Sequence, residues 1–188
     1  MITRLFQSSS RYLLILGLPA ILWAWEVAGG CTNIIVGRGA SADGSVMVTY
    51  SVDGVGVGNL HIIAGRERAD PGVKDAVEAD WEGPTFRVVG YLNEHQLAIA
   101  ETTWDGRPEL KCKAGLSYSR LMFLALRRCR TAREAIAEID RLTRTYGYSS
   151  SGETFCLADK NEAWIMDIIG KGPDEKGAVW VAARVPDD

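Results

Sequence analysis

The chain has 188 residues, of which 47% are hydrophobic and 24% charged, with a formal net charge of −3. This composition predicts one globular domain with a buried core, and no basic cluster favours nucleic-acid binding. The chain has too few cysteines for a disulfide-stapled miniprotein, and none has zinc-ligand spacing. They are Cys31, Cys112, Cys129 and Cys156.

Residues 1–30 have the pattern of a secretory signal peptide. Arg4 and Arg11 give this segment a positive start, and residues 12–25 are almost all apolar. A helix needs about 20 apolar residues to span a bilayer, which is more than this run offers. Pro19 inside the run also disfavours a stable membrane helix. We therefore expect a signal peptide that is removed.

The end of this segment places a cysteine at the start of the mature chain. Ala28 and Gly30 are small residues of the kind that signal peptidases favour at the third and first positions before the cut. Cleavage after Gly30 would export a mature domain of residues 31–188 to the periplasm or the extracellular space. Cys31 would then have a free α-amine beside its thiol.

A β-hairpin is predicted directly after this cysteine. Residues 34–36 and 46–48 are apolar and rich in β-branched side chains, and the turn between them contains the pair Asp43-Gly44. Asp53 follows the second strand. A hairpin therefore brings Asp53 toward the start of the first strand.

A thiol beside an α-amine is a catalytic arrangement. The thiolate is the nucleophilic form, and a free cysteine has a pKa of about 8.5, so the thiol needs a nearby base. An α-amine has a pKa of about 7.7–8.0 and can take the thiol proton and later return it to a leaving group. We predict that Cys31 is the nucleophile and that Asp53 orients the amine. Two alternatives stay open, namely lipidation of Cys31 and a buried structural cysteine.

Neither the glycines nor the histidines indicate a cofactor. Glycines occur at positions 54, 56 and 58, but residues 59–63 favour a strand, whereas a dinucleotide-binding loop opens a helix. His61 and His95 are expected to be structural or solvated, because the α-amine already supplies a base. We expect no metal or organic cofactor.

The rest of the chain alternates between strand and helix patterns. Thr131 and Glu134 form a capping box, and Gly147 is a typical helix C-cap. Arg127 and Arg128 are expected at a solvated helix end. In chain order, we predict a polar connection at 66–84, a hairpin of strands 86–92 and 96–102, helices over 116–129 and 131–146, a hairpin of strands 155–158 and 163–169, and a last strand at 179–182.

Several motifs together resemble a known family. The stretch that begins at Cys31 contains CTNIIVG, ASADGSV and a strand closing on Asp53, and it resembles the start of the cysteine-type dipeptidases related to dipeptidase A and the secernins. Residues 91–104, 152–159 and 161–173 fit the same family. These dipeptidases belong to the N-terminal-nucleophile hydrolase superfamily, together with penicillin V acylase and bile salt hydrolase.

The resemblance implies an α+β fold, the αββα sandwich of the superfamily, of which this shorter chain would be an incomplete, N-terminal portion. It also implies a secreted dipeptidase with Cys31 as nucleophile. An asparagine supplies part of the oxyanion hole in the penicillin V acylase branch, and this chain has Thr103 there. Thr103, Glu101 and Tyr50 are therefore candidates for substrate binding or the oxyanion hole. Relatives often have Arg-Asn before the aspartate, where this chain has Tyr50 and Ser51.

Two alternative functions follow from the same residues. One is an acyl-amide hydrolase of the penicillin V acylase or bile salt hydrolase type. The other is a non-catalytic lipoprotein that is membrane-associated through lipid on Cys31. In the leading interpretation the partners are dipeptide substrates, with no nucleic acid and with membrane contact only through the signal segment.

Overall fold

The computed structural model describes residues 31–52, 58–67 and 75–187. The predicted first hairpin is confirmed: β1 (Cys31–Val36) pairs antiparallel with β2 (Met47–Val52), and Cys31 lies opposite Val52. Between them lie a short 3-10 helix (Arg38–Ala40) and a turn in which Gly44 has a φ of 75°. That positive φ favours glycine.

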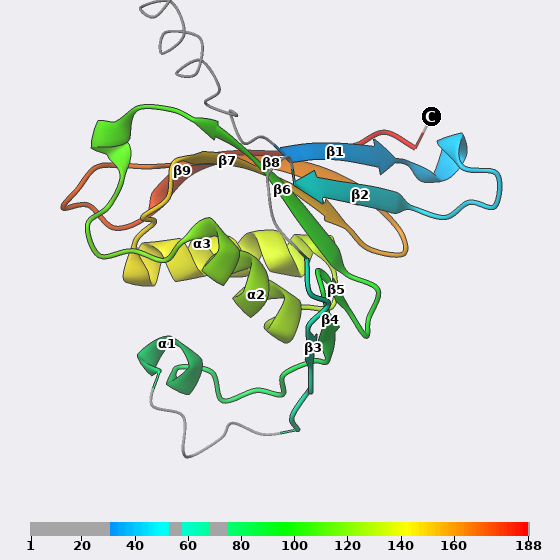
Figure 1. The fold of residues 1–188 in the computed structure, drawn as a ribbon, viewed down its shortest axis with the longest axis horizontal. Helices are drawn as coiled ribbons and strands as arrows, with labels where there is room; N and C mark the ends of the chain where they lie inside the picture. Colours follow the sequence, from blue (N-terminus) through cyan, green and yellow to red (C-terminus); the bar gives the residue numbers. More distant parts are fainter. Residues whose placement is uncertain (1–30, 53–57, 68–74, 188) are drawn as a thin grey trace, which may run out of the picture.

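A seven-stranded sheet forms the centre of the molecule, and every neighbouring pair of strands in it is antiparallel. Its strands follow chain order from one edge to the other (Figure 1). They are β3 (Ile62–Ile63), β4 (Val88–Val89), β5 (Leu92–Asn93), β6 (Ala98–Asp105), β7 (Gly152–Ala158), β8 (Ala163–Gly170) and β9 (Ala178–Arg184).

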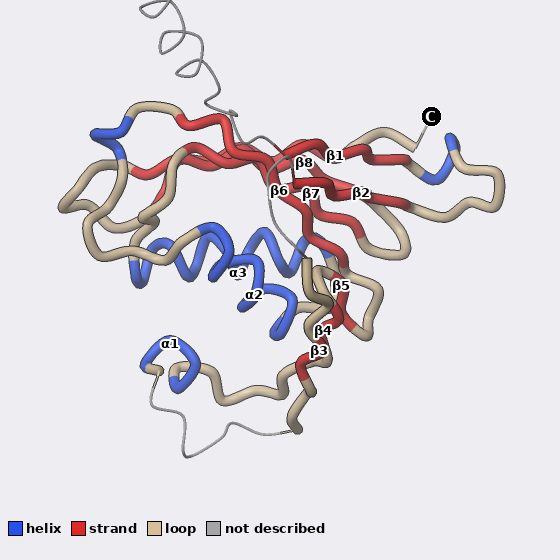
Figure 2. Tube along the Cα trace, in the orientation of Figure 1, coloured by secondary structure: helices blue, strands red, loops and turns tan. Residues whose placement is uncertain are grey.

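Two helices cover one face of this sheet, as Figure 2 shows. They are α2 (Tyr118–Arg128) and α3 (Ala132–Tyr146), close to the predicted ranges. The Thr131 side chain accepts a hydrogen bond from the backbone N–H of Glu134, which confirms Thr131 as the N-cap, and the Glu134 side chain accepts from the backbone N–H of Arg130 rather than of Thr131. Gly147 ends α3 with a φ of 91°.

The core lies between these helices and the sheet. Its largest fully buried side chains come from α2, α3, β6, β7, β8 and the adjoining loops. They are Tyr148, Phe155, Leu97, Ile99, Leu121, Met122, Leu124, Leu126, Ile139, Leu142, Leu157 and Met166. None of the helices in the described ranges is long and apolar enough to cross a membrane.

The β1–β2 hairpin lies against the other face of the sheet, over β6 and β7 (Figure 1). Among the described residues, no helix or strand covers the part of that face formed by β8 and β9. Met166 and Ile168 of β8 are buried toward the helices, and the alternation of side chains turns Ile165 the opposite way, where it is 40% exposed. Val179 and Val181 of β9 share this face. The order of layers is therefore helices, seven-stranded sheet and a two-stranded hairpin, a mixed α+β arrangement that fits the predicted class.

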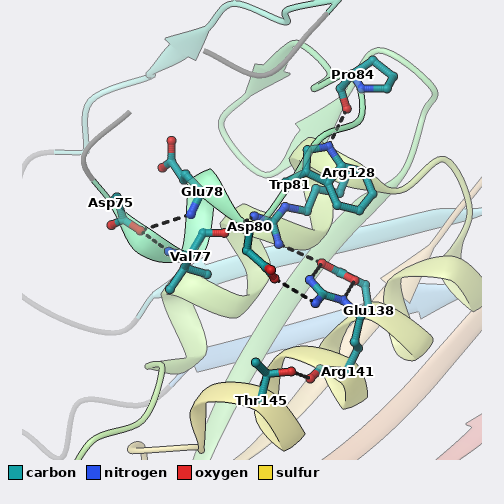
Figure 3. Close-up of polar contacts among 10 residues, drawn as sticks. All are labelled: Asp75, Val77, Glu78, Asp80, Trp81, Pro84, Arg128, Glu138, Arg141 and Thr145. Atoms are coloured by element: carbon teal, nitrogen blue, oxygen red, sulfur yellow. Dashed lines mark hydrogen bonds and ion pairs between the residues drawn. The ribbon is translucent and has the colours of Figure 1, made fainter. Parts of the chain in front are cut away.

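A short helix lies beyond α2 and α3, and ion pairs and a hydrogen bond connect it to them (Figure 3). This helix, α1 (Ala76–Ala79), falls inside the segment predicted as a polar connection. Glu138 of α3 accepts hydrogen bonds from Arg128 of α2 at 2.9 Å and from Arg141 at 2.7 and 2.9 Å. Arg141 reaches Asp80 at 3.1 Å, and Arg128 donates to a carbonyl oxygen of α1. The ion pairs thus join three helices.

Two predictions from the sequence are wrong. The strand predicted over residues 86–92 is split into β4 and β5, because Gly90 adopts a φ of 59° and turns the chain between them. Arg127 and Arg128 are not at a solvated helix end but are 7% and 6% exposed. Arg127 donates to the carbonyl of Ala64, 63 residues away in the sequence, and no local pattern reveals such a partner.

Candidate active site

Cys31 is the first residue of β1, half-buried where this strand meets β6. The Thr102 hydroxyl donates to the Cys31 carbonyl oxygen at 2.9 Å, and the Asn33 amide donates to the Glu101 carbonyl oxygen at 2.8 Å. β5 pairs with β6 only at Ala98, so the following residues of β6 are available for these contacts. The edge of β6 therefore fixes the start of β1.

Glu101 brings three of the predicted site residues together. One of its carboxylate oxygens, Oε1, lies 3.4 Å from Cys31 Sγ and accepts a hydrogen bond from the Tyr50 hydroxyl at 2.5 Å. The Glu101 side chain is 1% exposed, and its second oxygen, Oε2, is buried without a hydrogen-bond donor. A thiol from β1, a phenol from β2 and a carboxylate from β6 thus form one cluster.

Glu153 on β7 is a further member that the sequence reasoning missed. It lies opposite Thr103, whose hydroxyl contacts both Glu153 oxygens at 3.0 and 2.9 Å. Glu153 is 1% exposed and is the diagonal neighbour of Glu101 across the two strands, where its carboxyl can donate a hydrogen bond to Glu101 when it is protonated. The sequence pattern could have indicated that Glu153 is buried, because Glu153, Phe155 and Leu157 alternate along β7 and a strand places alternate side chains on one face.

The cluster disfavours negative charge. Burial, and then hydrogen bonding to Glu101, raises the pKa of Glu153 to about 8. Burial and the neighbouring Glu101 carboxylate also raise the pKa of the Cys31 thiol, and the hydrogen bond with Tyr50 opposes this only in part. The pKa of Tyr50 is raised far above its usual range by burial and by Glu101. Cys31 therefore stays a neutral thiol while its nitrogen is part of a peptide bond.

The other predicted residues have different positions. Asp53 lies outside the described residues, one position after Val52, the strand partner of Cys31. The Thr103 hydroxyl is engaged by Glu153. His95 packs edge-on against Phe86, with ring centroids 4.3 Å apart, which fits a structural role.

A cavity of about 550 Å³ lies beside the cluster, between β2 and the ends of β6 and β7. Tyr50 lines it and packs edge-on against Tyr91, with ring centroids 5.1 Å apart. Met47, Val48 and Ile99 contribute apolar surface. A space of this size suits a small organic molecule. Within the described part of the chain, no three His, Cys, Asp or Glu side chains are grouped to hold a metal ion.

The fold and this site define a class: an α+β protein with a thiol held beside buried carboxyls. Its residues 68–188 match the model of peptidase family C69. The chain belongs to this family, so the family resemblance predicted from the motifs is confirmed. The matched residues include Glu101 and Glu153 but not Cys31.

Curated relatives agree with the family. The chain is 28% identical over 186 residues to a probable dipeptidase B of Lactococcus lactis subsp. lactis (strain IL1403), with 85% of this chain and 38% of the relative covered. It is also 28% identical to a probable dipeptidase A of Streptococcus pyogenes serotype M3, with 84% and 38% covered. Identity to dipeptidase A of Lactobacillus helveticus is 27%, with the same coverage. The chain thus spans about 38% of the length of these relatives.

Proposed function

We propose that this chain is the N-terminal part of an exported dipeptidase whose nucleophile is the thiol of Cys31. The observation that supports this most is the position of Cys31, which is the first residue of β1 and is held 3.4 Å from a buried carboxylate oxygen. Membership of peptidase family C69 and the names of the relatives support the reaction class.

In this mechanism, removal of residues 1–30 converts the peptide nitrogen of Cys31 into an α-amine. The amine takes the thiol proton, and the sulfur attacks the carbonyl carbon of the dipeptide. The resulting ammonium then gives a proton to the nitrogen of the scissile peptide bond. The C–N bond breaks, the second amino acid departs, and the acyl group remains on Cys31 as a thioester. Water hydrolyses this thioester with the same amine as base. Every proton is supplied by Cys31 and water, and no cofactor is required.

The other expected roles are parts of the same proposal. Asp53 is assigned to orient the amine. The Thr103 hydroxyl already contacts Glu153, so a backbone N–H is the better candidate for the oxyanion hole. Tyr50 lines the cavity next to the cluster, where a dipeptide side chain could pack.

Export and intact-mass analysis test this proposal. The full-length protein that contains this chain is expressed with residues 1–30 in place, collected from the periplasm or medium, and analysed by mass spectrometry and N-terminal sequencing. We expect a chain that begins with a free Cys31 and hydrolyses dipeptides. An added diacylglycerol mass on Cys31 would support a lipoprotein instead, and several residues left before Cys31 would remove the base. Faster cleavage of acylated amino acids than of dipeptides would favour the acyl-amide hydrolase.

A further inference from the structure

Glu101 and Glu153 form a pair of buried carboxyls directly behind Cys31. Each is 1% exposed, they are diagonal neighbours on β6 and β7, and one can donate a hydrogen bond to the other when it is protonated. Two adjacent carboxylates in a low-dielectric interior repel strongly, so one of them keeps its proton. The donor pattern indicates which one.

Glu101 Oε2 is buried and has no hydrogen-bond donor unless Glu153 is protonated. Leaving a buried carboxylate oxygen unsatisfied is costly, and a proton on Glu153 removes that cost. The other Glu101 oxygen, Oε1, is already the acceptor for Tyr50 and Cys31. The pair thus holds one proton, on Glu153, and one negative charge, on Glu101.

The groups that face this charge are themselves acids. The ion pairs found in the described part of the chain leave out both Glu101 and Glu153. A buried carboxylate without a cation is unfavourable. The titratable neighbours of the pair are Cys31 of β1, Tyr50 of β2, Asp105 of β6, Tyr118 of α2 and Tyr148 after α3. Tyr91 packs against Tyr50.

We propose that Glu101 is a second positioning residue for the α-amine of Cys31, in addition to Asp53, with its charge kept in place by the proton on Glu153. This inference rests on the proposed removal of residues 1–30, which creates that amine. The nitrogen and Sγ of Cys31 are three bonds apart, and Glu101 Oε1 lies 3.4 Å from Sγ, so in the proposed arrangement the amine lies next to this carboxylate. The ammonium that forms is the missing cation.

In this arrangement the thiol of Cys31 is the nucleophile, its α-amine is the base, and the Glu101 carboxylate contacts the amine. When the thiol proton moves to the amine, the positive charge develops next to Glu101, as a carboxylate stabilises a protonated histidine in a hydrolase triad. Without the amine, burial and the Glu101 carboxylate both raise the pKa of the Cys31 thiol and so oppose formation of the thiolate. The sulfur therefore loses its proton only when the amine can accept it, and the unprocessed chain stays unreactive.

Matched glutamine variants test the assignment in the exported, processed protein. The pKa of the Cys31 α-amine is measured from the pH dependence of its acetylation, followed by mass spectrometry, and this needs no enzymatic activity. Glu101→Gln should lower that pKa by about 1 unit, because a carboxylate contact is lost. Glu153→Gln should change it much less, because its amide N–H can replace the proton donor to Glu101.

Kinetics add a second readout. Glu101→Gln should lower kcat for a dipeptide by about 100-fold with little change in KM. An unchanged kcat with a raised KM would mean that Glu101 binds the substrate and would overturn the proposal. Equal shifts of the amine pKa in both glutamine variants would also overturn it.

A third variant covers the case in which Glu101→Gln does not fold. Tyr50→Phe removes a donor from Glu101 and leaves its charge, so the amine pKa should rise, and a fall would contradict the proposal. The proposed function fails separately, if the mass shows no free Cys31 or if the wild-type protein hydrolyses no dipeptide.

Discussion

Two regions of this molecule bury glutamates, and they do so in opposite ways. Glu138, between α2 and α3, is 8% exposed and paired with Arg128 and Arg141, which lower its pKa against the effect of burial (Figure 3). Glu153, at the end of the same sheet, has a carboxyl and a hydroxyl as neighbours, and its pKa is raised.

The two arrangements have opposite consequences for the buried carboxyl group. A buried carboxylate with cations around it stabilises one arrangement of helices. A buried acid without a cation costs stability, and such groups are frequent at functional sites. Here the uncompensated pair lies directly behind the only cysteine of the described chain that is not buried.

The largest expected effect is on the rate of dipeptide hydrolysis, when the Cys31 thiol beside Glu101 and Glu153 is removed. Cys31→Ala should lower dipeptide hydrolysis by more than about 10⁴-fold, a loss of about 5 kcal/mol of transition-state stabilisation, because no sulfur remains to form the thioester. Cys112→Ala is the matched control and should stay within a few-fold of wild type. Steady-state kinetics on the exported protein measure both, and residual activity of a tenth in Cys31→Ala would exclude it as nucleophile.

The second test uses the pH dependence of stability. Because the folded-state pKa of Glu153 is above the unfolded value of about 4.3, the folded protein holds a proton that the unfolded chain releases. This contribution to the free energy of unfolding falls as pH rises from about 4.3 to about 8, by up to about 1.4 kcal/mol per pH unit. Glu153→Gln should remove that slope and be more stable than wild type at pH 8.

Urea unfolding of both proteins between pH 5 and 8 measures the difference. The difference between the two proteins isolates Glu153 from the other groups that titrate in this range. Parallel curves would show that Glu153 is ionised in the folded protein, as Glu138 is.

The third test removes the negative charge from the ion pairs of Glu138 with Arg128 and Arg141. Glu138→Gln should cost about 3 kcal/mol of unfolding free energy, because it leaves the buried guanidinium of Arg128 without its counter-charge. The surface pair of Lys113 and Asp174 is the control, and Lys113→Ala should cost less than about 1 kcal/mol. Chemical denaturation at pH 7 compares the two variants, and equal costs would refute the structural role of Glu138.

The smallest expected effect is at the start of α3. Thr131→Ala removes the acceptor for the N–H of Glu134 and should cost about 1 kcal/mol. Thr145→Ala, on the exposed part of the same helix, should change thermal unfolding very little. A Thr131 variant as stable as wild type would mean that the cap contributes nothing.

Local patterns were enough to predict much of the fold. The hairpin of β1 and β2, the hairpin of β7 and β8, and both ends of α3 follow from β-branched runs, turn residues and caps. The break at Gly90 was missed, because a glycine inside an apolar run can be either strand or turn. The short helix α1 was missed because Asp75 caps a helix of only one turn.

The candidate site was predictable only in part. Cys31, Tyr50 and Glu101 could be named from motifs, but their contacts join residues 51 and 70 positions apart in the sequence. The raised pKa of Glu153 depends on what surrounds it in three dimensions, and no sequence window contains that information.

The mechanism proposed for Cys31 passes through a thioester on its sulfur. The most direct measurement is to quench the exported protein with acid during turnover of a dipeptide and to map its peptides by mass spectrometry. We expect the peptide that begins with Cys31 to gain the mass of the N-terminal residue of the dipeptide, on sulfur, and hydroxylamine should remove it. An unmodified Cys31 peptide during rapid turnover, or an adduct at Cys112, Cys129 or Cys156, would contradict the account.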